Sequence, residues 1–284
     1  MPEEKFEAAL LSCVSENVRT ALAEDVGTGD LTANLVPEGQ HVCAQVIARE
    51  DAVICGQPWF NAVFVHLDAT IEINWDAAEG EKVNADQSVC EVRGPARPIL
   101  TGERSALNFL QLLSGTATAA HRYVDAVRGT DVTILDTRKT LPGLRLAQKY
   151  AVRCGGAENH RTGLFDAILV KENHIVAAGG IAAAVTAARQ LDSQVLLEVE
   201  TENLDQLQEC LATQVDRVLL DNFSLDELRA AVELRSQQAP HITLEASGGI
   251  TLENVRAIAE TGIDFISTGA LTKNVRAVDL SMRF

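Results

Sequence analysis

The chain reads VLLEVETENLDQLQECLATQVDRVLLD over residues 195–221, and this stretch decides the fold class. A short apolar run, Val195–Glu200, ends in an acid, and a second run, Arg217–Asp221, does the same. Between them, Leu204–Leu211 has the apolar periodicity of a helix. Short apolar runs predict buried strands, and an intervening helix predicts a crossover between parallel strands. The stretch therefore predicts one β/α/β unit.

The same alternation continues on both sides of this unit, from residue 132 onward. The predicted strands are Val132–Asp136, Ala167–Lys171, Val195–Glu200, Arg217–Asp221, Thr243–Ser247 and Asp264–Thr268, and further helices are predicted at Ile181–Gln190, Leu225–Arg235 and Leu252–Glu260. Serial β/α units with right-handed crossovers form either a barrel or an open doubly wound sheet. We favour the α/β barrel, because almost every run ends in a polar group, as strands do at a barrel mouth.

The first 115 residues or so have a different pattern. An amphipathic helix is predicted at Phe6–Glu24, followed by short strands at Ala44–Arg49, Ala52–Cys55, Ile71–Trp75 and Val89–Arg93. This pattern predicts a small α+β domain.

Two helices, Glu103–Leu113 and Ala117–Val127, are predicted to bridge the halves, the first capped by Thr101. Arg104 would then lie in a first helical turn, where the helix dipole disfavours a cation by about 0.3–1 kcal/mol. Arg104 is therefore either a solvated side chain that tolerates this cost or a residue with another purpose.

Composition narrows the class of partner. Lys and Arg total 24 against 40 Asp and Glu, a formal net charge of −16, and such a field repels nucleic acid and anionic membranes. No run approaches the roughly 18 apolar residues of a membrane span. The six cysteines are scattered without a Cys-x-x-Cys pair, and the N-terminus lacks a basic and apolar leader. We therefore expect a cytoplasmic protein that binds neither nucleic acid nor membranes.

The ends of the predicted strands and the loops beside them carry the candidate site: Arg138, Lys139, His160, Arg161, Lys171, Glu200, Asp221, Ser247, Gly248, Gly249 and Gly269. Each residue alone has an ordinary interpretation, as a solvated charge, a turn glycine or a helix cap. A barrel would bring all of them to one rim. Cations gathered in an acidic protein need an anion to offset their repulsion, so the set predicts a small, phosphorylated, anionic substrate.

Two parts of this set indicate particular ligands. Ser247-Gly248-Gly249 and Gly269 follow late strands, where glycine-rich loops of barrels receive a phosphate. Glu200 and Asp221 end adjacent runs. They either hold Mg²⁺, directly or through waters, or bind sugar hydroxyls.

All of these residues except Gly269 lie in motifs by which the chain resembles the quinolinate phosphoribosyltransferase family over nearly its whole length. The matching stretches, in order, are Glu24–Thr32, Asn108–Thr118, Asp136–Gly143, Gly155–Gly156 with Asn159–Arg161, Leu169–His174, Leu197–Glu200, Leu219–Asn222 and Glu245–Ile250. The segment Thr201–Asn203 and the tail after Thr272 match less clearly.

The resemblance implies an architecture and an assembly. An N-terminal open-faced α+β sandwich domain would span residues 1–115 and be joined by the C-terminal tail 271–284, and an incomplete, TIM-like α/β barrel would span 116–270. It also implies a homodimer with shared active sites, in which Arg104 reaches the partner's barrel. Whether dimers assemble further into hexamers stays open.

The resemblance also implies a reaction. The phosphoribosyl group of phosphoribosyl pyrophosphate would pass to quinolinate with decarboxylation, giving nicotinate mononucleotide, diphosphate and CO₂ for NAD biosynthesis. Arg104, Arg138, Lys139, His160, Arg161 and Lys171 would line the quinolinate pocket, Glu200 and Asp221 would face the ribose and the Mg²⁺-diphosphate, and Ser247, Gly248, Gly249 and Gly269 would seat a phosphate. The catalytic residues would be Lys139, Lys171, Glu200 and Asp221.

Three alternatives remain open. Relatives associated with molybdenum uptake keep the fold and the phosphoribosyl donor with another acceptor. A catalytically silent barrel would bind a phosphorylated metabolite as a sensor. Within the enzyme reading, Lys171 either protonates the decarboxylated ring or binds a carboxylate.

Overall fold

The computed structural model describes residues 3–191 and 194–284, and its contacts divide the chain into two compact units. The barrel unit comprises residues 122–139 and 157–270. The sandwich unit comprises the described residues up to 121 together with 140–156 and 271–284. Residues 140–156 thus separate the two segments of the barrel unit in sequence but pack with the N-terminal part of the chain.

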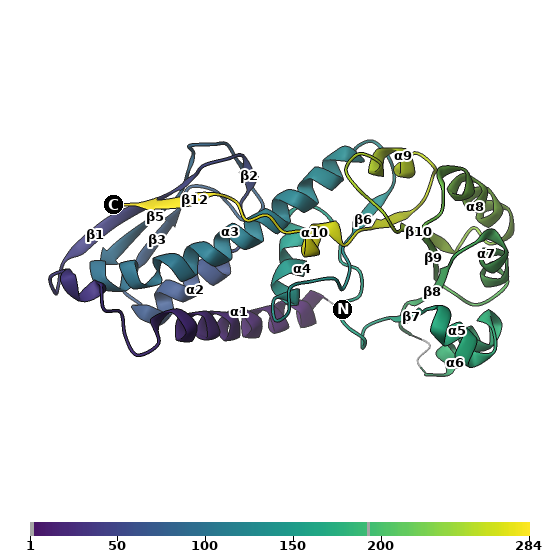
Figure 1. Cartoon of the computed structure of the whole chain (residues 1–284), viewed down its shortest axis with the longest axis horizontal. Coiled ribbons are helices and arrows are strands. Elements are labelled where there is room, and N and C mark those ends of the chain that lie inside the picture. Colours follow the sequence, from purple (N-terminus) through teal and green to yellow (C-terminus); the bar gives the residue numbers. More distant parts are fainter. Residues whose placement is uncertain (1–2, 192–193) are drawn as a thin grey trace. The chain divides into compact units, whose positions relative to one another are not determined.

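The barrel unit contains a parallel sheet of six strands (Figure 1). The strands are β6 (Thr133–Leu135), β7 (Ile168–Val170), β8 (Leu197–Thr201), β9 (Arg217–Asp221), β10 (Thr243–Ser247) and β11 (Phe265–Ser267). Their order, β6-β11-β10-β9-β8-β7, leaves β6 and β7 at opposite edges, so the barrel is incomplete. Each strand falls on one of the six predicted runs, and the predicted fold class is confirmed.

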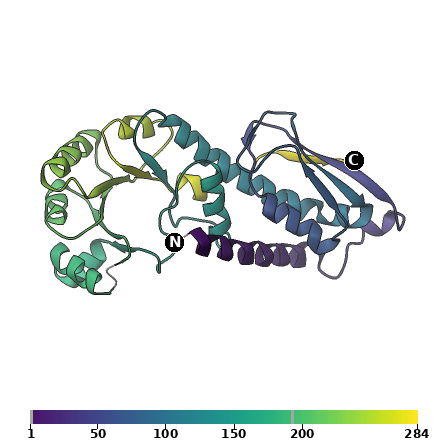
Figure 2. The ribbon, with the colours of Figure 1, turned by 180° about the vertical axis from the view of Figure 1, so that it is seen from behind.

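Helices connect these strands and, in both views, α6 to α9 lie outside the curved row of strands (Figures 1 and 2). They are α5 (Glu172–Ala178), α6 (Ile181–Leu191), α7 (Leu204–Leu211), α8 (Leu225–Gln238) and α9 (Val255–Ala259). Ser224 and Glu227 form a capping box at the start of α8, which fixes that boundary. The predicted helix at Leu252–Glu260 is shorter, because Thr251 donates its N–H to the Asn254 side chain and a turn precedes α9.

The sandwich unit has an antiparallel sheet with the strand order β12-β1-β5-β3. Its strands are β1 (His41–Ala48), β3 (Glu72–Trp75), β5 (Ser88–Pro95) and β12 (Leu280–Arg283), and β2 (Ala52–Val53) pairs separately with β4 (Lys82–Val83). The helices are α1 (Glu3–Val26), α2 (Gln57–Leu67), α3 (Ala96–Ala126) and α4 (Arg145–Cys154), with short turns of helix at Ala33–Leu35 and α10 (Ala270–Lys273); residues 122–126 of α3 and Ala270 belong to the barrel unit. Trp59, Phe60 and Phe64 of α2 are fully buried in its core.

The C-terminal tail belongs to this sheet. Strand β12 pairs antiparallel with β1, so that Met282 lies opposite Val46. The last residues of the chain therefore complete the sheet of the sandwich unit.

The two predicted bridging helices are one continuous helix, α3, and the predicted break was wrong. Gly115 lies within the helix, and its lack of a side chain lets the backbone of Arg276 approach. A Cβ on Gly115 would lie 2.2 Å from the Arg276 carbonyl oxygen. Thr101 is not a cap either, since it lies inside α3 and its hydroxyl contacts Asp30 Oδ2 at 2.8 Å. Arg104 is consequently in the third turn, and the dipole argument for its placement does not hold.

Within residues 3–191 and 194–284, no helix combines the length and apolar composition needed to cross a bilayer.

Candidate active site

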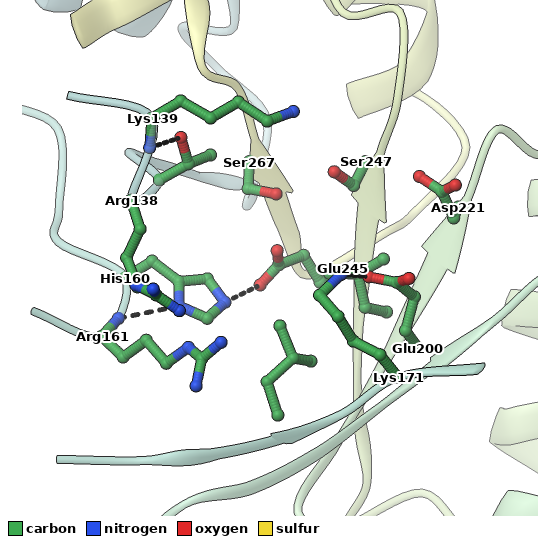
Figure 3. A pocket seen from close by; sticks show the side chains of 13 residues that line it. Arg138, Lys139, His160, Arg161, Lys171, Glu200, Asp221, Glu245, Ser247 and Ser267 are labelled. Atoms are coloured by element: carbon green, nitrogen blue, oxygen red, sulfur yellow. Dashed lines mark hydrogen bonds and ion pairs between the residues drawn. The ribbon is translucent and has the colours of Figure 1, made fainter. Parts of the chain in front are cut away.

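A pocket of about 390 Å³ lies at the carboxyl ends of the six strands of the barrel unit (Figure 3). It is lined by Thr137, Arg138, Lys139, His160, Arg161, Leu169, Lys171, Glu200, Leu219, Asp221, Glu245, Ser247 and Ser267. Parallel strands present their carboxyl ends at the same edge of a sheet, which brings together residues far apart in sequence. Eight of the eleven residues predicted at the strand ends and adjoining loops line this one pocket.

Basic side chains occupy one side of the pocket. Arg138 and Lys139 follow β6, and Arg161 lies in the connection that leads to β7 (Figure 3). Burial, and then the nearby charge of Arg138, lower the pKa of the Arg161 guanidinium from its ordinary value. Cations held this close to one another favour an anionic ligand.

Acidic side chains occupy the opposite side. Glu200 is the last residue but one of β8. It forms an ion pair with Lys171, the residue after β7. Asp221 ends the neighbouring strand β9 and accepts a hydrogen bond from the Asn222 amide at 2.8 Å. Burial, and then repulsion from Glu200, raise the pKa of Asp221 above its ordinary value. A carboxylate under such repulsion gains from a nearby cation.

The predicted phosphate residues divide into two groups. Ser247 lines the pocket, whereas Gly248, Gly249 and Gly269 are not among its lining residues. Gly248 has φ +92°, and a Cβ there would lie 2.1 Å from Asn222 Oδ1. A Cβ on Gly269 would lie 3.0 Å from Lys139 Cδ, so this glycine allows Lys139 to pass close to the backbone.

Arg104 belongs to α3 in the sandwich unit, whereas every lining residue of the pocket belongs to the barrel unit.

A cluster of charged side chains forms the floor of the pocket and continues beneath it, and we call His160, Glu198, Arg217 and Glu245 the floor cluster; His160 and Glu245 line the pocket. His160 Nε2 lies 2.9 Å from Glu198 Oε2 and 3.5 Å from Glu245 Oε2. Arg217 Nη1 donates to the same Glu245 oxygen at 3.1 Å, and its guanidinium stacks 3.8 Å from the Phe265 ring centroid. Glu198 and Glu245 are buried, with exposures of 1% and 0%.

Burial raises the pKa of both carboxyls of the floor cluster. The pKa of Glu245 rises to about 7, because burial and the charge of Glu198 outweigh the attraction of His160. Burial also raises the pKa of Glu198, although the charge of Arg217 opposes this. Two carboxyls in this position share a proton near neutral pH more readily than both ionise.

Sequence reasoning named His160 but missed Glu198, Arg217 and Glu245. A signal was present, because Glu198 and Glu245 are charged residues inside apolar runs, Arg217 begins one, and each lies two positions before a residue that lines the pocket. Residues two apart on a strand share a face. Glu198 therefore lies under Glu200, and Glu245 under Ser247.

The fold and the pocket define an α/β-barrel protein with a site for a small anionic ligand at the carboxyl ends of its strands, the usual place for catalysis in such barrels.

Family models agree with this class and specify it. The C-terminal domain of quinolinate phosphoribosyl transferase matches residues 116–283, and the N-terminal domain matches residues 30–114. The chain belongs to the quinolinate phosphoribosyltransferase family.

Individual relatives agree. The chain is 41% identical, over 94% of its length and 95% of the relative's, to the nicotinate-nucleotide pyrophosphorylase (carboxylating) of Mycobacterium leprae. It is 43% identical to the human protein of the same name, covering 84% of this chain and 81% of that one. The solved nicotinate-nucleotide pyrophosphorylase of Francisella tularensis superposes with a TM-score of 0.93 at 49% identity, covering 96% of each chain.

Proposed function

We propose that the chain transfers the phosphoribosyl group of phosphoribosyl pyrophosphate to quinolinate and decarboxylates the product to nicotinate mononucleotide, with release of diphosphate and CO₂. Family membership supports this reaction. The observation that carries the proposal is a pocket in which Arg138, Lys139 and Arg161 face Glu200 and Asp221 across its mouth. Its basic side suits a pyridine dicarboxylate and its acidic side suits a ribosyl cation.

The basic side would bind and orient quinolinate. Arg138 and Arg161 offer forked donors to two adjacent carboxylates, Lys139 lies with them on the pocket wall, and Lys171 would reach the ligand from the opposite side, where it pairs with Glu200. Binding through the carboxylates leaves the ring nitrogen lone pair free. That lone pair attacks the anomeric carbon of the donor as the bond to diphosphate breaks.

The acidic side would stabilise the ribosyl group as positive charge develops on it. Glu200 and Asp221 stand on the neighbouring strands β8 and β9, so both carboxylates face the same part of the pocket. Fixed negative charges aimed at a developing cation lower the barrier, because they need no reorganisation during the step.

Mg²⁺ fits this acidic side as an ion shared with the diphosphate. Carboxylate oxygens are the ligands that Mg²⁺ prefers, and the ion would neutralise charge on the leaving diphosphate. Among the described residues, Glu200 and Asp221 do not form a group of three close ligands, and Glu200 is also paired with Lys171. The protein would therefore hold the ion through these two carboxylates together with waters or diphosphate oxygens.

The glycine-rich ends of β10 and β11 would seat the phosphate. Ser247 lines the pocket, and Gly248, Gly249 and Gly269 follow the same two strands closely. Backbone N–H groups of such loops bind phosphate without side chains in the way.

Decarboxylation follows from the new bond to nitrogen. The C–CO₂⁻ bond breaks, its electron pair stays on the ring carbon beside the cationic nitrogen, and CO₂ leaves. A proton then adds to that carbon. Lys171 is a candidate donor, and the Lys171→Ala variant tests it: accumulation of a nucleotide that keeps both carboxylates supports the role, and unaltered turnover removes it.

The assembly that we propose is a homodimer with shared sites. Such dimers could pack further into hexamers without changing the sites. Arg104 would enter the partner's pocket. Mixing Arg104→Ala subunits with Lys139→Ala subunits tests this, because one wild-type site forms in a mixed dimer only if sites are shared. Recovery of activity supports shared sites, and an inactive mixture contradicts them.

One assay tests the reaction itself. The purified chain is incubated with quinolinate, phosphoribosyl pyrophosphate and Mg²⁺, and nicotinate mononucleotide, diphosphate and CO₂ are measured. Formation of all three supports the proposal. Binding of both substrates without product would favour a sensor, and transfer to another acceptor would favour the molybdenum-associated relatives.

A further inference from the structure

Both ring nitrogens of His160 are engaged by the protein. Nδ1 accepts the backbone N–H of Arg161 at 2.7 Å, and Nε2 faces Glu198 and Glu245. A ring nitrogen that accepts a hydrogen bond carries a lone pair and no proton, so the proton of a neutral imidazole must then be on Nε2. The ring that lines the pocket therefore has no nitrogen left to donate to a ligand.

We propose that Glu198 and Glu245 are positioning residues that hold His160 in its Nε2–H form, so that Nδ1 can fix the backbone of Arg161 for carboxylate binding. The role of the bound carboxylate rests on the proposed function, with quinolinate as the ligand. The hydrogen bond to Nδ1 and the positions of the two carboxyls beside Nε2 carry the rest.

The carboxylates select the form of His160 by charge and position. Glu198 Oε2 and Glu245 Oε2 both lie within 3.5 Å of Nε2. An ionised carboxylate only accepts hydrogen bonds, and the pair holds at most one shared proton, so a lone pair on Nε2 would face at least one acceptor with no proton between them. The Nδ1–H form would also point its proton at the Arg161 N–H, which leaves two partly buried groups unsatisfied.

Arg217 fixes Glu245 in turn. Its Nη1 lies 3.1 Å from the Glu245 oxygen that faces His160, and its guanidinium is held against the Phe265 ring. His160, Glu198 and Glu245 are also spaced closely enough to hold a metal ion. The Arg217 guanidinium, however, already supplies a positive charge at the shared oxygen.

The neighbouring backbone is anchored on both sides of Arg161. Before it, the buried carboxylate of Asp136 accepts the His160 N–H and the Asn159 amide, each at 2.8 Å. After it, Asp166 accepts the N–H groups of Thr162 and Gly163 at 2.8 and 2.9 Å.

The hydrogen bond from the Arg161 N–H to His160 Nδ1 therefore fixes the one backbone N–H that lies between the segments anchored by Asp136 and Asp166. Loss of the Nε2–H form would move the Arg161 backbone, and with it the guanidinium that faces the ligand.

Nitrogen NMR of the free protein, labelled with ¹⁵N-histidine, measures the tautomer directly. The chain has six histidines, and the His160 signals are those absent from the His160→Gln variant. We expect Nε2–H in the wild type. In the Glu198→Gln/Glu245→Gln double variant, side-chain amides replace both acceptors and can donate to Nε2, so the Nδ1–H form should become populated.

Steady-state kinetics then separates positioning from general damage. The double variant should raise KM for quinolinate by about tenfold, the size expected when one charge-assisted contact loses its alignment, while KM for phosphoribosyl pyrophosphate stays unchanged. Each single variant repeats the test if the double variant fails to fold. Glu233→Gln, an exposed position on α8, is the matched control and should change neither quantity.

Two results would overturn the inference: an unaltered Nε2–H signal in the folded variants, or equal rises in both KM values. A wild-type protein that forms no product would remove the proposed function alone, because the tautomer is read without substrate.

Discussion

Glu200 is the residue whose charge the proposed reaction needs most directly. Glu200→Gln keeps the shape of the side chain and removes the charge, and we expect kcat to fall by about 100-fold, the usual effect of losing one preorganised electrostatic group. Steady-state assays with both substrates measure this. Glu202→Gln, two residues further on and exposed, is the control and should keep wild-type kcat. A Glu200→Gln variant with wild-type kcat would contradict the assigned role.

Gly248 and Gly249 provide a matched pair at the same scale. Both have positive φ, +92° and +60°, but a Cβ on Gly248 would lie 2.1 Å from Asn222 Oδ1, whereas nothing lies within 4 Å of one on Gly249. Gly249→Ala should cost about 1–2 kcal/mol of unfolding free energy from backbone strain alone. Gly248→Ala should cost more, because Asn222 must also move. Urea unfolding of both variants measures the difference, and equal losses would contradict the close approach.

At the scale of elements, the long helix α3 depends on what its glycines face. Alanine in a helix interior is normally favoured over glycine by about 1 kcal/mol. At Gly115 the sign should reverse, because the added Cβ would lie 2.2 Å from the Arg276 carbonyl oxygen and the backbone of the C-terminal tail would have to shift. We expect Gly115→Ala to lose about 1–3 kcal/mol, the range for overpacking.

Gly102→Ala is the control within the same helix. A Cβ there would lie 2.7 Å from Leu67 Cδ1 and 3.0 Å from Phe64 Cε1, so side chains and not backbone would have to shift. Thermal and urea unfolding should find Gly102→Ala less destabilising than Gly115→Ala. A stabilising Gly115→Ala would show that the tail does not pack there in solution.

The elements that sequence reasoning predicted well are those with strong local patterns. The six strands of the barrel unit were predicted because each is a short apolar run with a polar end, and such runs are specific when they recur with helices between them. The break in α3 was predicted wrongly at Ser114–Thr116, a stretch that holds Gly115, and glycine weakens a helix interior. The role of Gly115 depends on the distant Arg276 backbone, which no local pattern shows.

The site was predictable at its rim and not at its floor. Lys171, Glu200 and Asp221 stand at the ends of runs, where topology alone places them around one mouth. Glu198 and Glu245 lie inside runs, and their importance depends on strand pairing and on a histidine delivered by a separate loop. Pairing of this kind is set by the tertiary structure, so the sequence shows the charges without their partners.

At the scale of the whole molecule, the floor cluster couples folding to pH. The pKa of Glu245 is raised from 4.5 to about 7 in the folded protein. Between these values the folded state holds a proton that the unfolded state releases. The contribution to stability is therefore fully present below about pH 4.5 and is lost as the pH rises through about 7, at up to about 1.4 kcal/mol per pH unit.

Urea unfolding followed by circular dichroism at pH 5 and at pH 7.5 should detect this loss as a fall in the free energy of unfolding. Glu245→Gln removes the titrating group and relieves Glu198 of a neighbouring charge, so the slope of stability against pH should flatten across this range. Glu233→Gln, which lacks a buried partner, should keep the wild-type slope. If Glu245→Gln kept that slope as well, the proton taken up on folding would have to reside on Glu198 or outside the floor cluster, and Glu245 would not be the titrating group.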